Sequence, residues 1–232
     1  MRRHVLLKFA GTTLAIALFF IAYFHLLHHP AYAVTTMPVT ALDGLIPFQP
    51  QALFVYLTLW LYVGVGPGLQ PDLLELSRYG LWVCLLCATG LAIFYFWPTQ
   101  VPPTGIDVSS YAGFSMLQGV DAAGNACPSM HVAIAAFTML RLEHVWRRLR
   151  APAFLSVLNL TWCVAIVLST LLTRQHVVLD ALAGALLGTA FAWASLRAPR
   201  LARRDAARGR GRTIARPTRA VPRAGVKLRA RR

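Results

Sequence analysis

The stretch TRQHVVLD, residues 173–180, brings Arg174, His176 and Asp180 to the head of a segment that otherwise has the composition of a lipid-embedded helix. Ionisable groups are costly inside a membrane and usually serve a function there. On a helix, His176 and Asp180 are four residues apart and share a face, so the carboxylate can accept a hydrogen bond from one imidazole nitrogen and leave the other to react. We therefore expect an oriented nucleophile or base, with a structural bridge between two helices as the alternative.

Two glycines continue this helix face in steps of four. Gly184 and Gly188 form a small-xxx-small stripe, which lets a second helix approach closely, so the face that carries the polar pair is predicted to point into the bundle. Arg174 lies on the opposite side of a continuous helix. It can join the pair only from the turn before the helix, where Thr173 is the expected N-cap.

The composition is that of a polytopic membrane protein, since 57% of the 232 residues are hydrophobic and 13% are charged. Apolar segments predict an all-α bundle of six transmembrane helices, at about residues 5–27, 52–66, 79–97, 130–142, 153–172 and 177–196. The net charge of +15 suggests nucleic-acid binding, but more than half of the basic residues follow Ala194 and the others flank apolar segments. Membrane orientation explains this distribution better, and the arginine tail is expected to contact anionic lipid headgroups.

Three regions are expected along the chain. Residues 1–27 form the first transmembrane helix, residues 28–196 the helical membrane domain, and residues 197–232 a disordered Arg-rich cytoplasmic tail. The tripeptide AYA, residues 31–33, resembles a signal-peptidase site, so cleavage after Ala33 is the alternative to an uncleaved first helix. The length of the apolar run favours the uncleaved helix.

The distribution of Lys and Arg predicts the orientation. They gather at the N-terminus, after the fourth predicted helix and in the tail, whereas residues 28–51 and 98–129 contain none. By the positive-inside rule both termini are cytoplasmic. Six spans then place His131, at the start of the fourth, and His176, at the start of the sixth, at the same non-cytoplasmic end. A bacterial inner (plasma) membrane is the expected location, with the site facing outside.

Two histidines, a carboxylate behind one of them and helix-start amides suit phosphoryl transfer. His176 is expected to attack phosphorus and form a phosphohistidine, while His131 protonates the leaving oxygen and later activates the acceptor. Arg174 would neutralise phosphoryl charge, and Ser129 and Gln175 are further candidates for phosphate binding. This chemistry requires no metal and no cofactor.

Two motifs carry a family resemblance. CPSMH, residues 127–131, and TRQH, residues 173–176, followed by Asp180, resemble the histidine motifs of the type 2 phosphatidic acid phosphatase superfamily. The inositolphosphorylceramide synthase-like branch is the most similar, since it shares the Thr-x-Gln-His sequence, the downstream Asp and a following Ala-Gly. The similarity also includes residues 43–50 and 96–102.

The resemblance implies a six-helix, metal-independent membrane enzyme, with His176 as nucleophile, Asp180 orienting it and His131 as acid and base. Two features depart from the pattern: the Lys-x6-Arg-Pro motif of the superfamily's phosphatases is absent, and Pro103 stands where this branch is expected to have an arginine.

The leading hypothesis is an enzyme that hydrolyses or transfers a phosphoryl group or phospho-headgroup of a lipid phosphate or phospholipid. Water and a lipid hydroxyl both stay open as acceptors, so the sequence does not separate a phosphatase from a transferase. The alternative, favoured by the missing cations, is a catalytically inactive scaffold or lipid transporter that keeps the fold.

Overall fold

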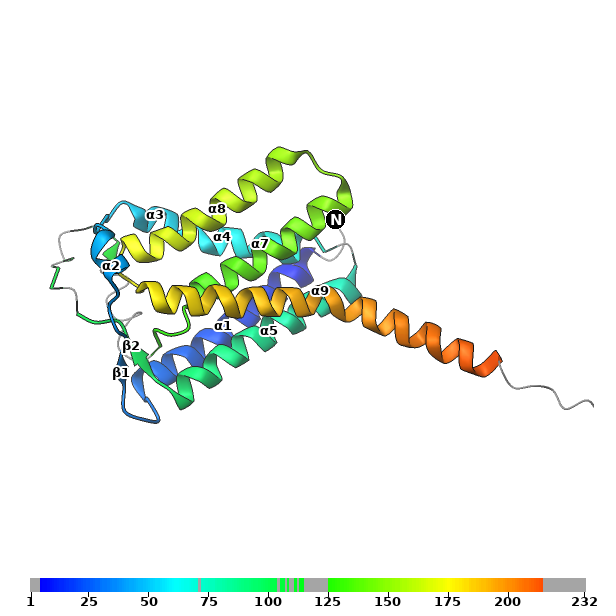
Figure 1. The fold of residues 1–232 in the computed structure, drawn as a ribbon, viewed down its shortest axis with the longest axis horizontal. Helices are drawn as coiled ribbons and strands as arrows, with labels where there is room; N and C mark the ends of the chain where they lie inside the picture. Colours follow the sequence, from blue (N-terminus) through cyan, green and yellow to red (C-terminus); the bar gives the residue numbers. More distant parts are fainter. Residues whose placement is uncertain are drawn as a thin grey trace, which may run out of the picture. The chain divides into compact units, whose positions relative to one another are not determined.

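The computed structural model describes residues 5–70, 72–103, 105–106, 108, 111, 113–114 and 125–214. These residues are mostly helical, which confirms the all-α class (Figure 1). In chain order the elements are α1 (Val5–His28), β1 (Thr35–Thr36), α2 (Ala41–Leu45), α3 (Ala52–Leu57), α4 (Leu59–Gly68), α5 (Leu73–Phe96), β2 (Thr99–Gln100), α7 (Met130–Leu149), α8 (Ala153–Leu172) and α9 (Val178–Ile214). Much of the predicted loop 98–129 lies outside the described residues.

Four helices are long and apolar enough to cross a membrane, namely α1, α5, α8 and the Val178–Ala198 part of α9. The predicted second span is two helices, α3 and α4, which meet at Thr58 and together form a shorter apolar segment, Ala52–Gly68. The predicted fourth span corresponds to α7, whose second half is basic. The helices therefore support a membrane protein, and four of the six predicted spans have the length and hydropathy of a membrane helix.

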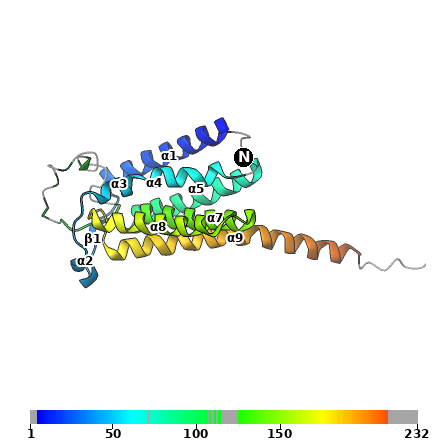
Figure 2. The same cartoon turned by 90° about the horizontal axis from the view of Figure 1, so that it is seen from above.

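Residues 1–196 form one compact unit. In Figure 2, α1 lies at one side of this unit, α7, α8 and α9 lie at the other, and α4 and α5 lie between them. Helix α7 packs against α4, α5 and α8. It contributes to two apolar clusters, with Ala133 and Phe137 in the first and Ala135 and Leu142 in the second. Since its neighbours shield α7 from lipid, it can be less apolar than the other helices.

The close helix approach predicted from the two glycines is confirmed. A Cβ atom on Gly184 would overlap the carbonyl oxygen of Ser129, and one on Gly188 would overlap the carbonyl oxygen of Ala133. The start of α7 therefore lies directly against the backbone of α9. Larger residues at either glycine would push the two helices apart, and with them the two histidine motifs.

A short parallel sheet holds the loops at one end of the bundle. Strand β1 follows α1 and pairs with β2, which follows α5, with Thr35 opposite Thr99. Thr99 also forms a bridge with Asn125, just before α7. Three loops that are far apart in sequence are thereby joined at the end where α7 and α9 begin (Figure 1). This arrangement confirms that His131 and His176 lie at the same end of the bundle.

Several predicted boundaries differ from the structure. Helix α5 begins at Leu73 rather than 79, because the Asp72 carboxylate accepts a hydrogen bond from Glu75 N and caps the helix. Helix α7 continues past residue 142 to Leu149. Helix α9 continues past the predicted end at residue 196, through residues 197–214. Ala and Arg, which dominate that segment, are strong helix formers. Residues 215–232 lie outside the described residues.

Candidate active site

The turn between α8 and α9 carries Thr173, Arg174 and His176. Thr173 ends α8: its hydroxyl donates to the Ser169 carbonyl, a bond typical of the last turn of a helix. Arg174 then adopts a left-handed conformation, with φ of 58°. The backbone N–H of His176 donates to the Thr170 carbonyl, which folds the turn back on α8. The prediction of Thr173 as the N-cap of the following helix is therefore wrong, because its side chain bonds to the preceding helix.

His176 and Asp180 form the predicted pair. The His176 Nδ1 and Asp180 Oδ2 atoms are 3.0 Å apart, and both side chains are buried, with 7% and 0% of their surface exposed. Because an ionised carboxylate only accepts hydrogen bonds, Nδ1 carries the proton and Nε2 is the nitrogen with a lone pair. The expected geometry differs in one respect: α9 begins at Val178, so His176 lies in the turn before the helix rather than on it.

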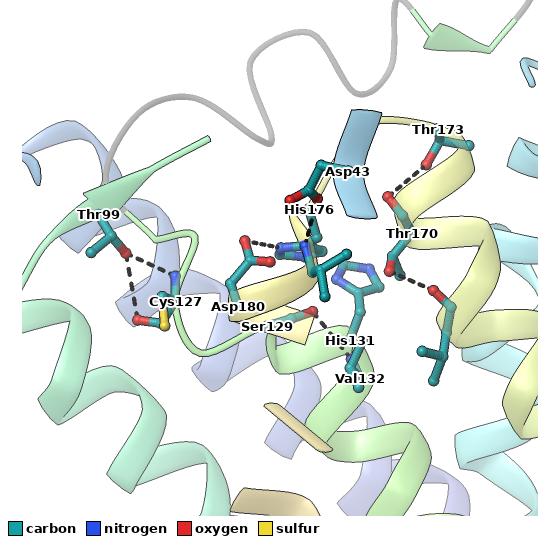
Figure 3. A network of polar contacts seen from close by, with 12 residues as sticks. Asp43, Thr99, Cys127, Ser129, His131, Val132, Thr170, Thr173, His176 and Asp180 are labelled. Carbon is teal, nitrogen blue, oxygen red and sulfur yellow. Dashed lines mark hydrogen bonds and ion pairs between the residues drawn. The ribbon is translucent and has the colours of Figure 1, made fainter. Parts of the chain in front are cut away.

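His131 lies in the first turn of α7, as predicted, and faces the other histidine (Figure 3). The two ring centroids are 6.2 Å apart. Tyr56 of α3 stacks on the His131 ring at 4.4 Å, and the Tyr56 hydroxyl is 3.3 Å from His131 Nδ1. Trp60 of α4 meets the same ring edge to face. Neither aromatic contact was predicted, because α3 precedes α7 by more than seventy residues and aromatic residues are common in membrane helices.

Ser129 joins the starts of α7 and α9. Its hydroxyl oxygen accepts a hydrogen bond from Val132 N, as an N-cap does, and its backbone N–H donates to the Asp180 carbonyl. The side chain is fully buried. Gln175, the other predicted phosphate ligand, donates from Nε2 to the Thr173 carbonyl at 3.4 Å. Neither residue lines the two cavities described below, so their observed contacts are structural.

Arg174 binds to α2 instead of the histidine pair. Its Nη1 donates to the Asp43 carbonyl at 3.0 Å, and its Nη2 donates to the Ile46 carbonyl at 2.6 Å. Among the described residues, the buried Arg174 Nε has no hydrogen-bond partner. The guanidinium group thus clamps α2 over the turn, while its Nε–H has no protein acceptor among the described residues.

Asp43 is a site residue that the sequence analysis missed. Its Oδ1 accepts from Val178 N, the first residue of α9, at 2.8 Å, and its Oδ2 accepts from Thr40 N and Oγ1. Burial raises the pKa of Asp43, but the bonds from Thr40 and Val178 and the nearby Arg174 guanidinium outweigh burial, and the pKa lies below its ordinary value. The sequence contains a pattern that could have indicated a role for Asp43, because Thr40 and Asp43 have the spacing of a capping box and lie in a loop without Lys or Arg.

Two cavities meet at His176. One, of about 220 Å³ and named the polar cavity for its charged residues Asp43 and Arg174, is also lined by His176 and by apolar residues that include Pro103. The other, of about 460 Å³, is lined by both histidines and by residues of α1, α4 and α5. Pro103, where the related branch is expected to have an arginine, thus borders the polar cavity. Across the described residues, no group of three His, Cys, Asp or Glu side chains is arranged to hold a metal ion.

Comparison with known proteins adds one match. The family model of the PAP2 superfamily matches residues 77–204, which contain both histidine motifs and amount to more than half of the chain. Comparisons with curated proteins and with solved structures find no match. Membership of this superfamily suggests phosphatase or phosphotransferase activity on lipid-type substrates, and so an enzyme. The chain therefore belongs to the PAP2 superfamily.

Proposed function

We propose that the protein transfers the phosphoryl group or phospho-headgroup of a lipid through a phosphohistidine on His176. The observation that carries this proposal is the hydrogen bond between His176 Nδ1 and Asp180 Oδ2, with His131 on the other side of the space in front of His176. A centroid distance of 6.2 Å lets one phosphoryl group lie between the rings within hydrogen-bond reach of both.

The reaction has two steps. His176 Nε2 attacks phosphorus and forms an N–P bond, while the bond from phosphorus to the leaving oxygen breaks. His131, which takes up a proton when the phosphate anion binds beside it, gives that proton to the leaving oxygen. His131 then takes a proton from the acceptor, either water or a lipid hydroxyl, whose oxygen attacks phosphorus. The N–P bond breaks and His176 is restored. Asp180 holds the His176 ring and stabilises the positive charge that the ring acquires.

Arg174 is the cation that we assign to the phosphoryl oxygens. Its Nε has no protein acceptor among the described residues, and Arg174 lines the polar cavity together with His176. The contacts of Ser129 and Gln175 favour structural roles for these two residues over the predicted phosphate binding. Because Pro103 supplies no charge where a second arginine was expected, phosphate binding rests on fewer cations.

We further propose six spans, with α3 and α4 together as the second and α7 as the fourth. Both chain termini are then cytoplasmic, and the histidines face the outside of a plasma membrane. The positive-inside rule supports this orientation, since Arg147 and Arg148 lie at the end of α7 opposite His131. The inositolphosphorylceramide synthase-like branch, in which a lipid hydroxyl is the acceptor, is the finer assignment that the Thr-x-Gln-His sequence favours.

The test is a panel of lipid phosphates and phospholipids offered to the purified full-length protein in detergent with a metal chelator. We expect release of phosphate or transfer of a headgroup, loss of turnover in His176→Ala, and a labelled phosphohistidine when labelled substrate is quenched in acid-free conditions. His29→Ala, an exposed histidine at the same end of the bundle, is the matched control. Full turnover in His176→Ala overturns the mechanism, and a chain that takes up no label with any substrate is the inactive scaffold or transporter.

A further inference from the structure

The larger cavity starts at the two histidines and continues between α1, α4 and α5. Its volume is about 460 Å³, and apart from His131, His176 and Asn125 its lining is largely aliphatic and aromatic. With both of its histidines at one end and a largely apolar lining elsewhere, the cavity suits an amphiphile whose head lies at the histidines. The cavity does not belong to the phosphoryl chemistry itself, which takes place at its mouth.

The depth of the cavity follows from α1. Residues of α1 line it at intervals of three or four residues from Tyr23 back to Leu7, so a single face of the helix borders the whole length. At about 1.5 Å per residue these residues extend over about 24 Å. The hydrocarbon core of a bilayer is about 30 Å thick, so the cavity reaches well beyond the middle of the membrane.

The far part of the cavity has glycines where other residues would fill it. A Cβ atom on Gly11 of α1 or on Gly80 of α5 would meet no heavy atom within 4 Å. Both glycines line the cavity. Neither glycine packs against a neighbouring helix, so a larger residue at either position would extend into the open space there without displacing the neighbouring helices.

We propose that this cavity binds one hydrocarbon tail of the lipid substrate, with the phosphate between His131 and His176, and that the space at Gly80 and Gly11 sets the tail length that is accepted. The proposal rests on the proposed function, because the phosphate at the histidines fixes where the tail begins. A tail that moves from the bilayer or a micelle into this cavity passes from one apolar medium to another. The hydrophobic effect therefore does not distinguish between tails, and the cavity selects them by how well they fit.

The test uses the full-length protein in detergent and single-chain alkyl phosphates with short and long tails. Gly80→Leu fills the far part of the cavity, and Gly64→Leu is the matched control, since Gly64 of α4 also has open space at its Cβ position but does not line the cavity. We expect Gly80→Leu to lower kcat/KM for the long tail about tenfold or more, which is the discrimination an apolar pocket achieves for one or two methylene groups. The short tail and the control variant should be unaffected.

A second measurement does not require turnover. A long-chain alkyl phosphate with a photoreactive group on its last carbon should label Leu7, Gly11, Leu76 or Gly80. Labelling confined to residues that do not line the cavity, such as Phe9 or Leu81, overturns the tail assignment. The same chain-length profile in Gly80→Leu and wild type also overturns it. Failure of the wild-type protein to act on any short-chain phosphate counts instead against the proposed function, so the two failures are distinguishable.

Discussion

The two histidines of the site are held in opposite ways. His176 lies in a turn, where a carboxylate bonds to its ring and α2 is clamped over the adjacent backbone by Arg174. His131 lies on a helix, where Tyr56 and Trp60 surround its ring. A carboxylate stabilises a positive imidazole, whereas an aromatic stack mainly fixes the position of the ring. The difference matches the two proposed roles, a nucleophile that becomes positively charged and an acid and base that must change its protonation state.

Among the substitutions that test this difference between the two histidines, Asp180→Asn should lower kcat the most. The amide cannot stabilise a positive His176, and its NH₂ group can donate to Nδ1 and so favour the wrong tautomer. We expect kcat to fall by about 10³–10⁴-fold, as for the equivalent change in enzymes with a histidine–carboxylate pair. Phosphate release or headgroup transfer under saturating substrate measures it. Asp72→Asn, an N-cap change at α5 away from the site, should leave kcat unchanged. A nearly active Asp180→Asn would show that the carboxylate is only structural.

Asp43→Asn should have an intermediate effect, because Asp43 positions the turn without touching the phosphate. Both Asp43 oxygens accept hydrogen bonds, one from Val178 N and the other from Thr40. In the Asn variant the side-chain NH₂ group replaces one of these oxygens, so it faces a donor and one hydrogen bond is lost. We expect about a tenfold loss of kcat/KM, the equivalent of one charge-assisted hydrogen bond. Asp72→Asn again serves as the control. Unchanged kcat/KM would mean that α2 can leave the turn without disturbing His176.

The same residue predicts a dependence of stability on pH. Since the pKa of Asp43 is lowered in the folded protein, its stabilising contribution is fully present above the ordinary value of 3.8 and is lost as the pH falls through the folded value. Thermal unfolding in detergent should therefore show a smaller acid-induced decrease of Tm in Asp43→Asn than in wild type. If Tm decreased equally in the two proteins, Asp43 would not contribute to the loss of stability in acid.

Tyr56→Phe should have the smallest effect of the three. The variant keeps the ring that stacks on His131 and loses only the hydroxyl that lies 3.3 Å from Nδ1. We expect kcat to fall about fivefold, the size of one net hydrogen bond. Tyr95→Phe, an exposed tyrosine at the same end of the bundle, is the control. A loss as large as that of Asp180→Asn would contradict the view that position, rather than charge, is what the aromatic residues provide.

The local part of the site was predictable and the distant part was not. His176 and Asp180 are four residues apart and were paired correctly, although His176 precedes the helix. Thr173 was misassigned because its hydroxyl can cap the helix on either side, and only the backbone path shows which one it bonds. The contacts of Asp43 and Tyr56 join segments separated by more than seventy residues, and nothing in the local pattern indicates such a pairing.

The membrane-embedded helical class, the two histidine motifs and the glycines that bring α7 against α9 can all be read from the amino-acid sequence. These are properties of composition and short-range spacing, since side chains three or four residues apart must share a helix face. Three further features are visible only in the folded protein: Arg174 binds α2, Asp43 caps α9, and an apolar cavity leads away from the histidines. These features depend on which distant helices meet and on the space left between them, and that follows from packing of the whole bundle.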